Sequence, residues 1–118
     1  MSNTSVRSQN GLTASAYVNL WSPQAGKKFR LYFLRVSFTK ESTTPAQELF
    51  AVKDGATTFV VQDVSQGVLT APGVPLIYDF HFHNNGYLSL AADNKLSVGL
   101  QNPLSTGVWG CIAWGCEE

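Results

Sequence analysis

The sequence predicts an all-β sandwich or barrel, because apolar residues recur with a period of two in short runs separated by turn residues. The apolar positions Leu76, Tyr78, Phe80 and Phe82 alternate strictly with other residues, as expected for a strand with one buried face. No window of helical length holds a period of 3.6 residues. The chain has 118 residues, close to the commonest size for one domain, so we expect a single core.

The N-terminal residues differ from the rest, because they are polar and without any period. We expect residues 1–12 to form an extended N-terminal arm that is disordered alone or ordered by a partner. Residues 13–118 are expected to form the domain, a jelly-roll-like β-sandwich of about eight strands.

Two strands are predicted before residue 40. Residues 14–21 alternate, with Leu20 on the apolar phase and Trp21 on the polar phase. Residues 28–39 form a longer strand whose apolar phase changes between Phe33 and Leu34. Such a phase slip is what a β-bulge or a crossing between sheets produces.

The next segment allows two interpretations. Thr44–Gln47 has the form of a helix start, with Thr as the cap and Pro45 at the first position. The apolar run at residues 49–52 is short, however, and Asp54-Gly55 stands between it and the β-branched run at residues 57–61. Asp-Gly between two apolar runs is typical of a hairpin with a type I′ turn, and we favour the hairpin.

The remaining strands follow at regular spacing. An extended piece is expected at residues 68–70, a strand at 76–83, a short strand at 87–90 and another at 96–101. The last strand is expected at residues 108–115, with turn or loop residues such as Asn84-Asn85-Gly86 and Asp93-Asn94 between them.

Charge and hydropathy exclude some classes of function. Eight basic residues balance eight acidic ones, and only 14% of the residues are charged. A nucleic-acid-binding domain usually has a basic excess, so we expect no nucleic-acid partner. No run approaches the roughly 18 apolar residues of a membrane span, and the N-terminus lacks a signal-peptide pattern. We therefore expect no membrane partner and synthesis in a cytoplasm.

Cys111 and Cys116 are expected to be reduced thiols that serve as small apolar residues. They are five residues apart in a predicted strand, so they face opposite sides and their Cα atoms lie roughly 16 Å apart. A disulfide needs a separation below about 7 Å and would require a sharp turn.

No catalytic motif is present, and we expect neither an enzyme nor a cofactor. One constellation deserves comparison: Asp79, His81 and His83 share a face of the predicted strand, and two imidazoles with a carboxylate can bind zinc or iron. They would span roughly 13 Å along one strand, too far to converge without a bend. A polar outer face and a histidine cluster at a subunit interface are the other interpretations.

Trp109 and Trp114 are five residues apart in the last strand and therefore cannot share a face. Either one is part of the core while the other lies on the surface, or both are largely buried. An exposed tryptophan is a common anchor for a protein or a sugar ring, and Trp21 is a similar candidate.

From about Arg30 onward the layout resembles the small jelly-roll capsid decoration, or cement, proteins of tailed bacteriophages. The resemblance rests on the hairpin at residues 49–59, on Leu96–Leu100 ahead of a loop, and on the ending at residues 108–118, with its aromatic, glycine and acidic residues. It implies a structural virion protein that is made in the host cytoplasm. Such a protein binds the outside of an icosahedral shell, with the major capsid protein and itself as partners, often as a homotrimer.

The expected contact residues of such a protein lie in the arm and at the tryptophans. They are Val6, Arg7, Leu12, Trp21 and Trp114. Three other classes remain open: a phage tail, fibre or adaptor component, a carbohydrate-binding module with tryptophans as sugar platforms, and a metal-dependent cupin-like enzyme.

Overall fold

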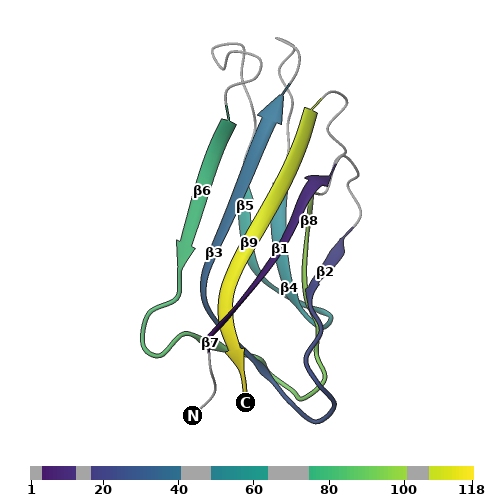
Figure 1. The fold of residues 1–118 in the computed structure, drawn as a ribbon, viewed down its shortest axis with the longest axis vertical. Coiled ribbons are helices and arrows are strands. Elements are labelled where there is room, and N and C mark those ends of the chain that lie inside the picture. The colour runs from purple at the N-terminus through teal and green to yellow at the C-terminus, as the bar shows by residue number, and fades with distance from the viewer. Residues whose placement is uncertain (1–3, 13–16, 41–48, 64–74, 101–106) are drawn as a thin grey trace.

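The computed structural model describes residues 4–12, 17–40, 49–63, 75–100 and 107–118, which form two antiparallel sheets packed as a β-sandwich. In Figure 1 the sheet of β6, β3, β9 and β1 lies in front of the other. The described residues contain no helix, and so none that could span a membrane. The strands are β1 (Ser5–Leu12), β2 (Val18–Trp21), β3 (Phe29–Lys40), β4 (Leu49–Asp54), β5 (Thr57–Asp63), β6 (Pro75–His81), β7 (Tyr87–Leu88), β8 (Leu96–Leu100) and β9 (Gly107–Glu117).

The strands pair from the two ends of the chain inwards. β1 pairs with β9, β2 with β8, β3 with β6 and β4 with β5. The front sheet, sheet A, has the order β1-β9-β3-β6, with the short β7 also paired to β3, and sheet B has the order β2-β8-β4-β5. The chain is thus one long hairpin rolled into two sheets, which is the predicted jelly roll.

The core lies between the inner faces of the two sheets. Trp109 of β9 and Phe38 of β3 pack from sheet A against Phe50 of β4 in sheet B, with ring centroids 6.2 to 6.4 Å apart. All three side chains are buried. The predicted alternation in β6 is confirmed, since Tyr78 and Phe80 pack against the core while Ile77 is exposed.

The predicted phase slip in β3 is a bulge. The pairing of β3 with β9 shifts register between Leu31 and Phe33, so Leu31 and Leu34 are both buried while Tyr32 is exposed. The extra residue keeps apolar side chains on the inner face along the whole twelve-residue strand.

The predicted hairpin between the runs at residues 49–52 and 57–61 is confirmed, but its turn lies one residue later than expected. Asp54 pairs with Thr57, so the central residues are Gly55 and Ala56. Gly55 has a φ of 59° and Ala56 has no positive φ, which is the φ pattern of a type II′ turn with glycine first. Asp54 ends β4 instead, with its side chain buried.

The structure differs from the sequence analysis at the N-terminus, where the expected arm is a strand. Residues 5–12 pair antiparallel with β9, from Ser5 opposite Gly115 to Leu12 opposite Trp109. The strand has no alternation to reveal it because it is held by backbone pairing at the edge of sheet A, where few of its side chains need to be apolar.

The last strand follows its prediction. Both cysteines are free and buried, and burial raises the pKa of Cys111 to about 12. Trp109 is in the core, with 2% of its surface exposed, and Trp114 lies half-buried on the outer face. The possible helix start at residues 44–47, residues 14–16 of the first predicted strand and the extended piece at 68–70 lie outside the described residues.

Candidate functional site

The outer face of sheet A carries a row of apolar and aromatic side chains that crosses four strands. Val6 of β1 lies opposite Trp114 of β9, Trp114 opposite Phe33 of β3, and Phe33 opposite His81 of β6. The ring centroids of Phe33 and Trp114 are 4.9 Å apart, and those of Phe33 and His81 are 4.8 Å apart. The side chain of Ile112 follows on the same face of β9. We call Val6, Phe33, Ile112 and Trp114 the outer patch.

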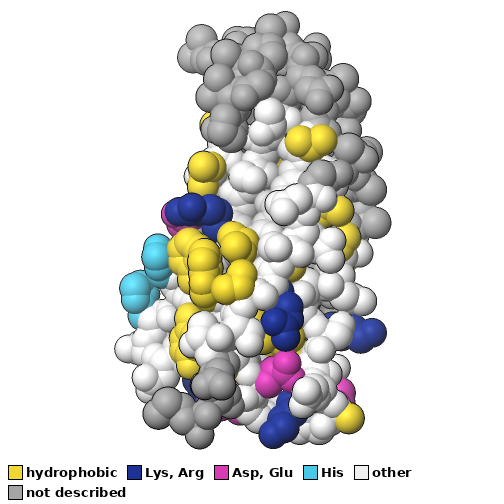
Figure 2. Space-filling model, in the orientation of Figure 1, with side chains coloured by type: hydrophobic (Ala, Val, Ile, Leu, Met, Phe, Trp, Pro, Cys, Tyr) yellow, Lys and Arg dark blue, Asp and Glu magenta, His cyan; other side chains and the backbone are white. Residues whose placement is uncertain are grey.

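The outer patch is open to solvent. Val6 is 46% exposed, and Phe33, Ile112 and Trp114 are half-buried. Figure 2 looks onto this face and shows hydrophobic side chains gathered at its centre, beside histidine side chains. Exposed apolar side chains that lie next to one another mark an interaction surface more often than single ones do.

An ion pair borders the outer patch. Arg35 of β3 donates two hydrogen bonds to Asp79 of β6, from Nε to Oδ1 at 2.7 Å and from Nη2 to Oδ2 at 3.0 Å. This contact holds the pKa of the Asp79 carboxyl below its usual value and raises the pKa of Arg35. The guanidinium carbon lies 5.7 Å from the centroid of Phe33. The border therefore adds no net charge to the face.

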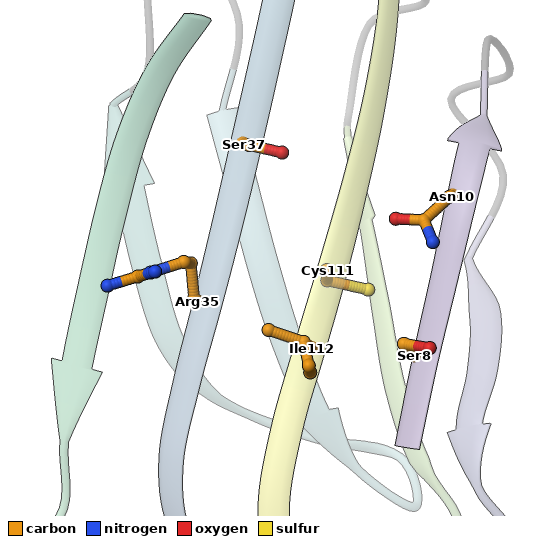
Figure 3. Close-up of a pocket in the computed structure, with 6 residues that line it drawn as sticks. All are labelled: Ser8, Asn10, Arg35, Ser37, Cys111 and Ile112. Atoms are coloured by element: carbon orange, nitrogen blue, oxygen red, sulfur yellow. The ribbon is translucent and has the colours of Figure 1, made fainter. Parts of the chain in front are cut away.

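A depression of about 190 Å³ lies next to the outer patch, and both polar and apolar residues line it: Ser8, Asn10, Arg35, Ser37, Cys111 and Ile112. Figure 3 shows Ser8 and Asn10 on β1 at one side of β9, and Ser37 on β3 at the other. Gly110 of β9 lets Asn10 approach closely, since a Cβ there would lie 2.8 Å from Asn10 Oδ1. The depression thus offers hydroxyl and amide groups to a ligand beside an aromatic surface.

Two of the five predicted contact residues belong to the outer patch. Val6 and Trp114 face each other across β1 and β9. Leu12 instead packs partly buried against the core. Arg7 lies with its guanidinium carbon 4.6 Å from the ring centroid of Trp21 and its Nη2 3.8 Å from Glu117 Oε2.

Trp21 was expected at the surface, but only 1% of it is exposed in the folded chain. The pairing of β2 with β8 shifts register between Asn19 and Trp21, so Leu20 and Trp21 are both buried. The Trp21 indole N–H donates to Glu117 Oε2 at 3.2 Å. The bulge turned a residue from the polar phase inwards, which alternation along one strand could not reveal.

Three residues of this face were missed by the sequence analysis: Phe33, Ile112 and Ile77. Ile77 is 54% exposed and lies beyond the Arg35–Asp79 pair, opposite Ser37. The sequence contains one signal for Ile77, because it is a large aliphatic residue on the polar phase of an alternating strand. Phe33 had none, because the bulge after Leu31 decides which face it joins.

The histidines do not form a metal centre with Asp79. Asp79 accepts hydrogen bonds from Arg35, the His81 ring lies tilted against Phe33, and His83 lies in the turn after β6. Within the described ranges, no three His, Cys, Asp or Glu side chains gather closely enough to hold a metal ion.

Asp54 and Ser89 are the two buried polar residues in the described part of the chain, and a polar cluster surrounds Asp54. Its carboxylate accepts hydrogen bonds from the Tyr87 hydroxyl at 2.8 Å, the Ser89 hydroxyl at 2.7 Å, the Leu90 amide at 2.7 Å and Asn94 Nδ2 at 2.9 Å. Burial alone would raise the pKa of Asp54, but these hydrogen bonds outweigh it and hold the pKa below its usual value. Burial and the nearby carboxylate raise the pKa of Tyr87. Because Tyr87, Ser89, Leu90 and Asn94 all donate to Asp54, the cluster ties residues 87–94 to β4.

Comparisons with known proteins add no further assignment. No family model matches the chain. No curated protein matches it either. The geometry of the outer patch and of the depression is therefore the basis for a functional proposal.

Proposed function

We propose that this protein is a non-enzymatic structural protein that binds the outer surface of a bacteriophage shell through the outer patch. The observation that carries the proposal is the row Val6–Trp114–Phe33, which lies open on sheet A rather than in the core. Large aromatic side chains with aliphatic neighbours are the usual anchors of protein interfaces.

The chemistry of the face favours a protein surface with apolar character as the partner. Arg35 and Asp79 neutralise each other, and the whole chain has no formal net charge at pH 7. Long-range electrostatic attraction therefore contributes little, and affinity must come from burying the outer patch.

Binding to a shell would multiply a modest affinity. In the arrangement implied by the resemblance to cement proteins, copies associate as a homotrimer on the major capsid protein. Linked copies that engage repeated sites bind with a combined strength far above that of one copy. The jelly roll is compatible with this role but supports many others, so the outer patch carries more of the argument than the fold.

The test is sedimentation of a lysate from cells that make the protein through a dense cushion, followed by mass spectrometry of the pellet. The proposal expects the chain to pellet with megadalton particles at a copy number comparable to that of the main shell protein. A few copies per particle would favour a tail, fibre or adaptor role instead. Complete retention in the supernatant would contradict binding to a particle.

A carbohydrate-binding module is the second candidate, favoured by the depression that adjoins the outer patch at Ile112. Ser8, Asn10 and Ser37 offer hydrogen-bonding groups for sugar hydroxyls, and the indole of Trp114 in the outer patch offers a ring to stack on. A glycan array with wild-type protein and Ser37→Leu separates the two candidates. Glycan binding that Ser37→Leu abolishes would favour this module, whereas no glycan binding would leave the shell proposal in place.

A further inference from the structure

Strand β1 contributes little to the hydrophobic core. Among the described residues, every buried hydrophobic side chain lies outside β1. Leu12 is partly buried against the core, whereas Val6, Ser8, Gln9 and Asn10 are exposed. Within the described residues, removing β1 would therefore take away from the packing between the two sheets only the contacts of Leu12 with the core and of Arg7 with Trp21.

What holds β1 in place is its backbone pairing with β9 and a small number of side-chain contacts. The ladder runs from Ser5 opposite Gly115 to Leu12 opposite Trp109, with an irregularity after Gln9. Arg7 adds its contacts with Trp21 and Glu117. Elements with few buried apolar contacts open at a lower free energy than the core does.

The edge of β9 that β1 covers would be unfavourable if it were left unpaired. β9 has eleven residues, and its central part, Val108–Cys116, is rich in apolar and aromatic side chains. A long apolar strand with an unpaired edge attracts other strands and promotes aggregation. Once β1 leaves, β9 therefore requires a replacement strand.

The edge of β9, together with Trp21 of β2, fits the sequence of β1 at three places. Gly110 leaves room for Asn10, since a Cβ would lie 2.8 Å from Asn10 Oδ1 and 2.9 Å from the Gln9 carbonyl oxygen. Arg7 meets the ring of Trp21, and Leu12 lies opposite Trp109. A strand with the same residues at the same spacing is found in every other copy of this chain.

We infer that β1 is exchanged between copies of this chain, so that β1 of one copy pairs with β9 of a second copy in the same register. The contacts are the same within one chain and between two, so exchange requires only the opening of β1 and a high local concentration of copies. This interaction does not depend on the identity of the surface that the outer patch binds.

Cross-strand cysteines test the exchange directly. Ser8 lies opposite Ile112, and opposite residues of an antiparallel pair have Cα atoms about 4.5 to 5.5 Å apart, which suits a disulfide. Ser8→Cys and Ile112→Cys are introduced into separate full-length chains, which are mixed at high concentration, incubated and oxidised. Linking peptides are then identified by mass spectrometry.

The control pair is Ser8→Cys mixed with Val108→Cys, because Val108 is also exposed on β9 but lies four residues out of register. We expect the Ser8–Ile112 linkage between chains to exceed the control linkage at least fivefold and to rise with incubation time. The double variant Ser8→Cys/Ile112→Cys should close within one chain at high dilution. Equal linkage in the two mixtures, or a double variant that fails to close, would overturn the inference.

Discussion

Asp54 holds the segment of residues 87–94 against β4. Its side chain is buried and accepts hydrogen bonds from Tyr87, Ser89, Leu90 and Asn94. Without the carboxylate, Tyr87, Leu90 and Asn94 lose an acceptor at a part-buried position, whereas the Ser89 hydroxyl can still donate to the Ala91 carbonyl oxygen at 3.1 Å. Such donors are costly, whereas the net gain from one satisfied hydrogen bond is small.

The substitution Asp54→Ala should lower the free energy of unfolding by about 3 kcal/mol, because charge-assisted hydrogen bonds are lost and part-buried donors remain unpaired. Urea unfolding followed by tryptophan fluorescence measures this loss. Asp79→Ala is the matched control, since it also removes a hydrogen-bonded carboxylate but from an exposed position. A similar loss in both variants would show that enclosure of the Asp54 cluster is not what matters.

The contribution of Asp54 should depend on pH in a defined direction. Its pKa is lower in the folded chain than its usual value, so the folded state favours the ionised form. The stabilisation is then complete above the unfolded-state pKa of about 3.9 and is lost as the pH falls through the lower folded pKa. The difference in unfolding free energy between wild type and Asp54→Asn, measured from pH 7 to pH 2, should therefore stay constant above about pH 5 and shrink below about pH 4. A difference that grows on acidification would contradict this assignment.

At the scale of elements, the β4–β5 hairpin depends on Gly55. Its φ is 59°, and a Cβ would lie 2.9 Å from Asn94 Cγ and Oδ1. Gly55→Ala should therefore destabilise the fold by about 2 kcal/mol or more, through the unfavourable φ and displacement of Asn94 from Asp54.

The control for the hairpin is Gly26→Ala. Gly26 has a φ of 79° with no atom within 4 Å of a Cβ, so this variant should show the backbone cost alone, about 1 kcal/mol. Comparing the thermal unfolding of Gly55→Ala and Gly26→Ala separates the backbone cost from the cost of displacing Asn94. Equal losses would mean that the contact with Asn94 contributes nothing.

Strands with a regular pattern could be predicted from the sequence, and irregular ones could not. The alternation of β6 gave both its position and its buried face, and the slip in β3 predicted its bulge. β1 was missed as a strand because its pairing with β9 joins residues about a hundred positions apart. The bulge at Asn19–Trp21 depends on the register with β8, which no local pattern contains.

At the scale of the whole molecule, the candidate site also depends on pairing between strands that lie far apart in the sequence. This dependence limited what could be predicted of the site. The outer patch brings together Val6, Phe33, Ile112 and Trp114 from three strands. The jelly roll places the first and last described strands side by side and β3 next to them. The sequence could nominate Val6 and Trp114 one at a time, but only the sheet order makes them neighbours.

The central claim is that the outer patch is the surface that binds a particle. Purified wild type, Trp114→Ser and Val61→Ser are each added to particles isolated from the cells that make the protein, and the bound fraction is measured by sedimentation. Val61 is the control, because it is 58% exposed on β5 of the other sheet. Loss of an interface anchor costs about 2 kcal/mol, so Trp114→Ser should bind roughly 30-fold more weakly. Val61→Ser should bind like wild type. Equal binding of Trp114→Ser and wild type, or no binding of wild type, would contradict the account.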